Sequence, residues 1–269
     1  MTPLGGRGEH ARGRRDTAAA NLRERHRIPP AAALGLAAVL GCAVLGCAVR
    51  SPLERAIAAR GGPLPALARS VEARVEQGFP GLWRWRTVYR VPDRYAWTIE
   101  TTRDPDHYLF DGLTVRAFVG GREVSADTSP GAALRSHARF MAVIGLDALR
   151  AAGVTVTPLA PSDLPAGVVA GLEVRFEDGT RYLLGMDGRG MITRAVGPVA
   201  LPPFGAGEVT VEFDDFRPTE GWLLPYRARW QLGGVPLAVE WVLAACPDPP
   251  GLEAVDFATP AGLPACPPR

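Results

Sequence analysis

Apolar and polar side chains alternate along residues 83–90. One face of this segment carries Trp83, Trp85, Thr87 and Tyr89, and the other carries Arg84, Arg86 and Arg90. Successive side chains of a β-strand point to opposite faces, so the pattern predicts a strand with one apolar face. After Pro92, which lacks the N–H needed for strand pairing, Tyr95, Trp97 and Ile99 resume the apolar face. Asp111-Gly112 then predicts a tight turn.

The same alternation returns through the C-terminal half of the chain. Its predicted strands cover residues 172–176, 181–186, 191–196, 208–213, 222–230 and 237–243. In the last two we assign Trp222, Trp230 and Trp241 to the apolar face, and Glu240 to the solvated one. Short strands joined by tight turns predict an antiparallel meander, and a sheet of this length is expected to curl into a barrel or half-barrel.

Two segments have apolar residues at helical spacing. They cover residues 52–77, where Gly61-Gly62-Pro63 separates a short helix from a longer one, and residues 131–151, where Gly145 is a second break point. We expect both to cover the open apolar face of the sheet. The predicted fold class is therefore mainly β (α+β): a curled antiparallel sheet forming a half-open barrel covered by a helical lid.

The N-terminus has the features of an export signal. Residues 1–27 are basic and are not expected to fold, and residues 28–47 contain no charged residue. This apolar stretch ends in two similar tetrads, Val39-Leu40-Gly41-Cys42 and Val44-Leu45-Gly46-Cys47. Each resembles the lipobox of bacterial lipoproteins, in which the cysteine is acylated. An uncleaved membrane anchor and a cleaved secretion signal are the alternatives, and all three place residues 48–269 outside the cytoplasm as a single domain.

Composition and charge narrow the class of partner. The 269 residues carry a formal net charge of +2, and all basic residues are Arg, with no Lys. Residues 1–47 hold seven Arg against three acidic residues, so residues 48–269 carry a net charge of −2. A slightly acidic body argues against nucleic acid as a partner.

Cys246 and Cys266 remain once the two cysteines of the export segment are set aside. In an oxidising compartment they predict one disulfide that fixes the Pro-rich C-terminal tail. It would close a loop of about 20 residues, worth on the order of 3 kcal/mol. A metal site is not expected, because no histidine lies near either cysteine in the sequence and the spacing does not suit zinc.

The sequence contains none of the motifs that identify common catalytic sites. His107 lies in a turn-like stretch, His137 lies in a predicted helix, and Asp214-Asp215 resembles a strand end with two solvated charges. We therefore expect no catalytic residue, no metal and no cofactor. A hydrolase acting on lipid or envelope substrates is a remote alternative that would depend on His107 or His137.

Three motifs resemble a known family. They are Val91-Pro92-Asp93-Arg94-Tyr95-Ala96-Trp97, then Phe110-Asp111-Gly112-Leu113-Thr114-Val115-Arg116-Ala117-Phe118, and near the end Val255-Asp256-Phe257-Ala258-Thr259-Pro260-Ala261-Gly262. Together they are similar to the lipoprotein-localisation fold of the LolA and LolB carriers and receptors, over roughly residues 52–262. The resemblance implies a half-open barrel with a helical lid that holds acyl chains. In the carriers an arginine often precedes the motif proline, whereas this chain has Val91 there, with Arg90 and Arg94 nearby.

The apolar face supplies the candidate binding residues. We expect a hydrophobic cavity for acyl chains of lipoproteins or other amphiphilic lipids, lined by Trp83, Trp85, Tyr89, Trp97, Ile99, Trp222, Trp230 and Trp241. The alternative is a solid core in a structural envelope lipoprotein that acts through protein partners. In the first hypothesis the protein is anchored at Cys42 or Cys47 and faces the periplasm, with the outer membrane favoured. It would exchange its cargo with the membrane and with other envelope transport proteins.

Overall fold

A computed structural model describes residues 50–77, 80–100, 104–125, 129–165, 167–201, 205–249, 252, 255–260, 263 and 266. Residues 50–269 form one compact unit. The predicted export segment, with Cys42 and Cys47, lies outside the described residues.

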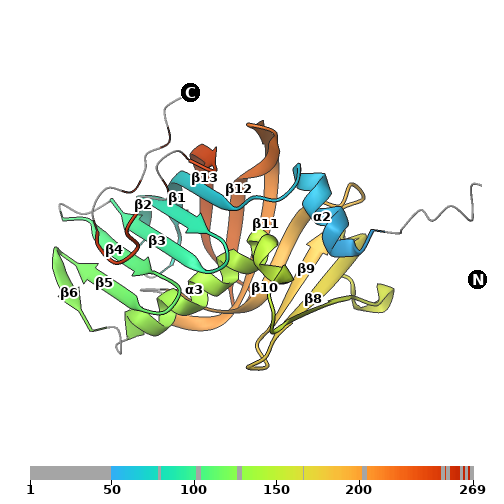
Figure 1. The fold of residues 1–269 in the computed structure, drawn as a ribbon, viewed down its shortest axis with the longest axis horizontal. Helices are drawn as coiled ribbons and strands as arrows, with labels where there is room; N and C mark the ends of the chain where they lie inside the picture. The colour runs from blue at the N-terminus through green and yellow to red at the C-terminus, as the bar shows by residue number, and fades with distance from the viewer. Residues whose placement is uncertain are drawn as a thin grey trace, which may run out of the picture. The chain divides into compact units, whose positions relative to one another are not determined.

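The structure is dominated by one antiparallel sheet of 13 strands (Figure 1). The strands are β1 (Ala66–Val75), β2 (Gly81–Arg90), β3 (Arg94–Ile99), β4 (Asp106–Phe110), β5 (Val115–Val119), β6 (Arg122–Val124), β7 (Val154–Pro158), β8 (Ala170–Phe176), β9 (Arg181–Met186), β10 (Ile192–Leu201), β11 (Gly205–Thr219), β12 (Trp222–Leu232) and β13 (Val235–Pro247). The helices are α2 (Pro52–Arg60) and α3 (Ser129–Gly145), with short 3₁₀ turns η1 (Asp147–Arg150) and η2 (Pro161–Asp163).

Two meanders meet at the centre of the sheet. Strands β1 to β6 run outward in one direction, β13 back to β7 run outward in the other, and pairing between β1 and β13 joins the two arms. The end strands β6 and β7 belong to opposite edges, so the sheet is curled but not closed. Helix α3 connects these edges and crosses the inner face (Figure 1). The predicted fold class, a half-open barrel with a helical lid, is confirmed.

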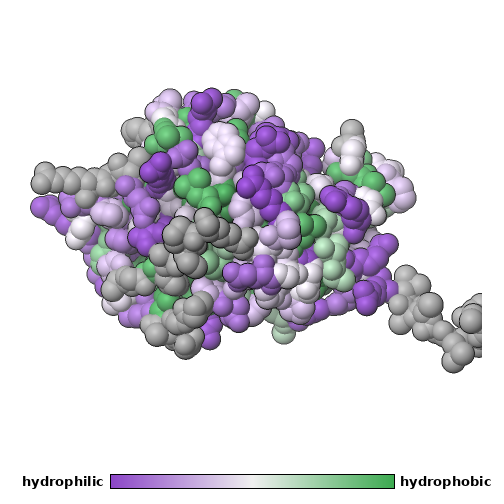
Figure 2. Space-filling view, turned by 90° about the horizontal axis from the view of Figure 1, so that it is seen from above, coloured by the Kyte–Doolittle hydropathy of each residue, from purple (hydrophilic) through white to green (hydrophobic). Residues whose placement is uncertain are grey.

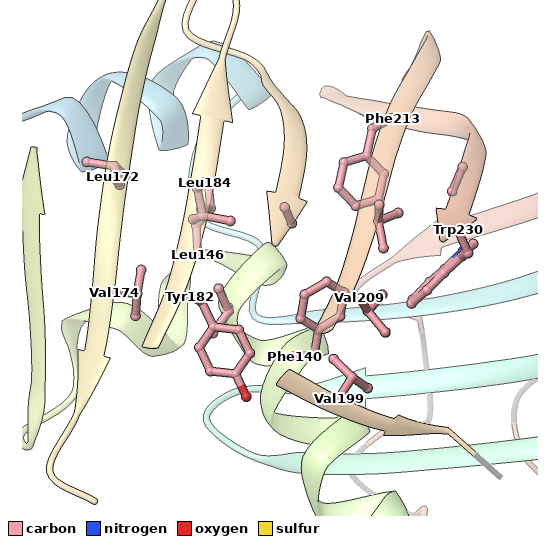
Figure 3. Close-up of a cluster of buried hydrophobic side chains, with 14 of the residues drawn as sticks. Phe140, Leu146, Leu172, Val174, Tyr182, Leu184, Val199, Val209, Phe213 and Trp230 are labelled. Carbon is pink, nitrogen blue, oxygen red and sulfur yellow. The ribbon is translucent and has the colours of Figure 1, made fainter. Parts of the chain in front are cut away.

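Helix α3 divides the inner core into two parts. Leu134, Ala138 and Met141 pack with apolar residues of β1 to β5, whereas Phe140 and Val143 pack with apolar residues of β8 to β11. Figure 3 shows the second part, where Phe140 lies between the helix and the strands, near Tyr182 and Trp230. The 3.6-residue helical repeat places these two sets on different sides of α3, so one lid helix buries apolar surface of both arms.

Helix α2 begins and ends where its sequence dictates. The Ser51 hydroxyl accepts a hydrogen bond from the Glu54 N–H at 3.2 Å, and Gly61 ends the helix with a left-handed φ of 109°. Gly61 lies against the β11–β12 turn, where an added Cβ would be only 2.3 Å from the Gly221 carbonyl oxygen. The predicted helix over 131–151 is likewise present and ends at Gly145, before η1.

The longer helix predicted after Pro63 was wrong, because residues 66–75 form strand β1. Ala66 and Ala68 are buried on the outer face, whereas Val71, Ala73 and Val75 are buried on the inner face. Because apolar residues lie on both faces, the sequence does not alternate between apolar and polar positions as a half-buried strand does. Its apolar residues instead fall at a spacing that is typical of a helix.

The C-terminal tail covers the outer face of β1 to β4. Leu252, Phe257 and Leu263 pack there against small and aliphatic residues of the strands, namely Ala66, Ala68, Val88, Ala96 and Leu109. Arg86 and Arg116 donate hydrogen bonds to the tail carbonyl oxygens of Leu263 and Ala258. Cys246 and Cys266 are paired with Cα atoms 5.6 Å apart, within the usual range for a disulfide. Their oxidation remains a prediction.

The face seen in Figure 2 is mostly hydrophilic, with apolar residues in small separate patches. Among the described residues, no helix is long and apolar enough to span a membrane.

Candidate functional site

A hollow lies between the two helices and the inner face of the sheet. Its volume is about 90 Å³ and its wall is mostly apolar. It is lined by Ala56 and Arg60 of α2; by Leu64, Leu67, Arg69, Thr87 and Tyr89 of β1, β2 and the segment before them; by Met141, Ile144, Gly145 and Leu146 at the end of α3; and by Met191, Ile192, Phe213, Phe216, Leu223, Leu224, Pro225 and Ala245 of β10 to β13 and their connections. We call it the lid cavity.

Small residues keep the lid cavity open at three points of its wall. Ala56 of α2, Gly145 of α3 and Ala245 of β13 each stand where a larger side chain would enter the hollow. Gly145 also allows the end of α3 to approach β2, since an added Cβ would lie 3.1 Å from the Tyr89 ring. Burial raises the pKa of the Tyr89 hydroxyl, which donates a hydrogen bond to the Pro92 carbonyl at 3.2 Å.

A buried ion pair joins the two helical elements beside the cavity. Arg60 Nη2 lies 2.7 Å from Asp147 Oδ2, and the side chains are 9% and 8% exposed. Arg60 Nη1 also donates to the Gly145 carbonyl at 2.5 Å, and the Leu64 N–H donates to Asp147 Oδ2 at 2.8 Å. Burial lowers the pKa of Arg60, and the Asp147 carboxylate opposes that shift. The pair therefore ties α2, the end of α3 and the start of β1 together.

A smaller hollow of about 40 Å³ lies further along the inner face. It shares Arg69, Thr87 and Met141 with the lid cavity. The rest of its wall is largely aromatic and includes Val75, Trp85, Tyr95, Trp97, His137, Leu201, Trp230, Leu237, Ala238 and Glu240. We call it the inner cavity.

His137 of α3 is an aromatic spacer in this wall. Its ring is stacked between Trp97 and Trp230, with centroids 5.3 Å and 6.0 Å away. Burial, with a smaller effect of Arg69, lowers the pKa of His137 to about 3, so the ring is neutral at physiological pH. The structure thus gives His137 a packing role.

The other candidates for chemistry make surface interactions. His107 Nδ1 lies 3.1 Å from the Thr98 hydroxyl, and burial, with a smaller effect of Arg86, lowers the pKa of His107. Asp214 pairs with Arg227 and Arg229 across β11 and β12, and Asp215 pairs with Arg217. These carboxylates belong to exposed ion pairs.

The predicted cavity residues are distributed unevenly. Tyr89 lines the lid cavity, and Trp85, Trp97 and Trp230 line the inner cavity. Ile99 is buried in the inner core, and Trp83 and Trp222 pack partly buried against it, but these three line neither cavity. Trp222 donates its indole N–H to the Pro63 carbonyl at 3.0 Å.

Trp241 was wrongly assigned to the inner face. It lies on the outer face of β13 and is 37% exposed, whereas Ala238, Glu240 and Val242 face inward. The assignment placed the only charged residue of this strand in solvent, but Glu240 is 8% exposed. A register shift against β1, where Ser70 pairs with Ala244 and Val71 with Val242, then turns the end of the strand.

Sequence reasoning missed most of the lid cavity. Leu67 and Arg69 were placed in a helix, and the apolar wall residues of β11 and β12, such as Phe213 and Leu224, gave no signal beyond ordinary core alternation. Once β1 is recognised as a strand, Arg69 is the one charged residue on a face that otherwise carries Leu67, Val71, Ala73 and Val75, and this was the available signal for it.

Two solved structures are similar to this chain. One is a LolA superfamily protein from Nitrosomonas europaea, with 14% sequence identity, a TM-score of 0.47, and a match over 72% of this chain and 90% of that one. The other is a DUF1329 family protein from Desulfovibrio piger, with 10% sequence identity, a TM-score of 0.47, and a match over 73% of this chain and 92% of that one. No family model and no curated protein matches the sequence.

Proposed function

We propose that this protein binds the acyl chains of a lipoprotein, or of another amphiphilic lipid, in the lid cavity and passes them on without covalent chemistry. The observation that carries the proposal is the apolar hollow between a helical lid and the inner face of an open barrel. Each CH₂ group removed from water in such a site contributes about 0.8 kcal/mol, so one long chain supplies affinity with few polar contacts.

The lid has to move for a long chain to enter. A cavity of about 90 Å³ is smaller than typical ligand sites, which span roughly 300–1,000 Å³. Polar contacts tie α3 to the β8–β10 arm, through Arg139 to Asp178 and through Ser136 to the Ala200 N–H. Towards β1 to β5 the described side chains of α3 make apolar contacts apart from a weak Arg69–Met141 contact, until the end of the helix, where the Arg60–Asp147 pair ties it to the segment before β1. Along the rest of the described helix, opening on the β1–β5 side therefore breaks fewer hydrogen bonds.

The anchoring and location of the protein belong to the same proposal. A lipid at Cys42 or Cys47 would hold the domain at a membrane, facing the periplasm, with the outer membrane favoured. An anchored domain acts as a receptor or tethered carrier, and other envelope transport proteins are then its natural exchange partners.

Photo-cross-linking tests the proposal on the full chain in lipid vesicles. A triacylated lipopeptide with a diazirine in one acyl chain should label peptides that contain Met141 or Leu224. An excess of the same lipopeptide without the diazirine should compete for this labelling, and an excess of the deacylated peptide should not. Ile144→Trp, which fills the cavity from α3, should reduce labelling, whereas Leu113→Trp, at a 91% exposed position, should not. A folded protein that gives no label inside the cavity would rule the proposal out.

A role through protein partners is the second candidate. The close packing of Trp85, Trp97 and Trp230 around a hollow of only about 40 Å³ favours a solid inner core over that part of the barrel. This function predicts no acyl uptake, together with a stable cross-linked complex in the envelope.

A further inference from the structure

Arg69 is a cation on the inner face of β1, between the lid cavity and the inner cavity. Its Nε donates to the Thr87 hydroxyl at 3.3 Å, and its Nη2 lies 4.0 Å from the Met141 sulfur. Both cavities count Arg69 among their wall residues. The other wall residues it meets are chiefly aliphatic or aromatic, so a full charge stands in an apolar hollow.

No carboxylate forms an ion pair with Arg69 among the residues that the structure describes. The nearest acidic candidate is Glu240, which also lines the inner cavity. Burial raises the pKa of Glu240 to about 7, opposed by Arg69, so this carboxyl is a weak source of negative charge at neutral pH. Arg69 is half-buried, and placing a guanidinium in largely apolar surroundings without a counter-charge is costly.

The wall of the inner cavity is also rich in unpaired donors. The Tyr95 hydroxyl and the indole N–H groups of Trp97 and Trp230 are buried and have no hydrogen-bond partner among the described residues. Trp230 lies near Glu240 without the geometry of a hydrogen bond. An indole N–H can only donate, and each buried group left unpaired costs about 1–3 kcal/mol. A ligand group that only accepts hydrogen bonds would relieve this imbalance.

We infer that Arg69 binds the anionic head of the ligand, a carboxylate or phosphate on an acyl chain, at the boundary of the two cavities. The head would be directed toward the donors of the inner cavity and the tail would fill the lid cavity. This inference rests on the proposed function and adds that the preferred cargo is an anionic amphiphile. Recognition of the head by Arg69 and Thr87 gives the otherwise apolar site its selectivity.

Three photoreactive probes with the same 16-carbon chain test the inference on the full chain in vesicles: a fatty acid, an alkyl phosphate and a neutral alcohol. At about pH 6, below the pKa of Glu240, Arg69→Met should reduce labelling of the cavity by the anionic probes about ten- to hundredfold, as expected for loss of a charged hydrogen bond. Labelling by the alcohol should not fall. Arg69→Lys should restore part of the anionic labelling. Arg84→Met removes a side chain that is 64% exposed and serves as the control.

The outcomes separate the two proposals. Arg69-dependent labelling by only one anionic probe identifies the head group as carboxylate or phosphate. Competition of inorganic phosphate with the alkyl phosphate would show that the anion alone occupies the site. If the alcohol labels the cavity and Arg69→Met leaves both anionic probes unchanged, the Arg69 inference is wrong and acyl binding stands. If none of the probes labels the wild-type cavity, the proposed function itself fails.

Discussion

The Arg60 guanidinium of α2 and the Asp147 carboxylate of η1 form a nearly buried ion pair with an N–O distance of 2.7 Å. It joins elements 87 residues apart in the chain and closes one end of the lid cavity. The same carboxylate accepts the Leu64 N–H, so one acidic side chain fixes both the lid and the entry into β1.

Removing one partner of this pair should destabilise the fold strongly. Asp147→Asn leaves the Arg60 charge buried and unpaired, and we expect a loss of about 3–5 kcal/mol in the free energy of unfolding. The measurement is urea denaturation. Glu54→Gln removes the partner of Arg150 in the exposed pair that also links α2 and η1, and should cost less than about 1 kcal/mol.

The double variant Arg60→Met/Asp147→Leu should recover much of the stability that Asp147→Asn loses, because it leaves no buried charge. Equal losses from Asp147→Asn and Glu54→Gln would show that the buried pair does not hold the lid.

Glu240 should make stability depend on pH. Burial raises its pKa from 4.5 to about 7, so the folded state favours the protonated form. The stabilising contribution of Glu240 to the free energy of unfolding is fully present below about pH 4.5. It falls by roughly 3 kcal/mol as the pH rises to about 7. Glu240→Gln removes this term, so the variant should gain stability relative to wild type across that range.

The difference between wild type and Glu240→Gln is the quantity to measure, because His137 acts in the opposite direction. The lowered pKa of His137 means that stability is lost as pH falls from about 6.5 toward 3. The His137 contribution is the same in both proteins, so it cancels when their free energies of unfolding are subtracted at the same pH. Glu208→Gln, an exposed glutamate on β11, is the control. A variant-to-wild-type difference that stays constant from pH 4.5 to 7 would contradict the buried placement of Glu240.

The alternating pattern predicted the strands that carry polar side chains along their outer face. Along β2, Trp85, Thr87 and Tyr89 are buried while Arg84 is exposed, as the sequence indicates. Strand β1 was not predicted as a strand because its outer face is apolar and is covered by the C-terminal tail. The local sequence contains no sign of a covering segment that lies nearly 200 residues further along the chain. Long-range covering of this kind is a property of the tertiary structure.

The candidate site was less predictable than the fold for a related reason. Tryptophan residues were chosen as cavity residues, but Trp97 and Trp230 pack against His137, and no tryptophan lines the larger hollow. A cavity is the space that side chains leave unfilled, and it depends on residues such as Gly145 and Ala245, which are far apart in the sequence, lining the same wall. The inward direction of Glu240 also contradicts the general rule that charged residues face solvent.

Acylation at one of the two N-terminal cysteines is the third prediction. In cells fed an alkyne fatty acid, the wild-type protein should incorporate the label, and either Cys42→Ala or Cys47→Ala should abolish it and release the domain from membranes. Cys246→Ala serves as the control, since Cys246 is buried beside the tail. Full labelling in both single variants but not in the double variant would mean that either cysteine can serve. Membrane association of the double variant without label would favour the uncleaved anchor.

The C-terminal tail leads to the last prediction. Its apolar residues Leu252, Phe257 and Leu263 cover the outer face of β1 to β4, and Cys266 holds the end of the tail beside Ala68. If Cys246 and Cys266 are oxidised as the sequence predicts, a reductant should lower the free energy of unfolding by about 3 kcal/mol. Cys266→Ser should show the lower value with or without reductant. Because the tail covers the outer face and the cavities lie on the inner face, acyl labelling of the folded variant should persist. Two free thiols in the non-reduced wild-type protein would instead leave the tail held by packing and by the Arg86 and Arg116 hydrogen bonds.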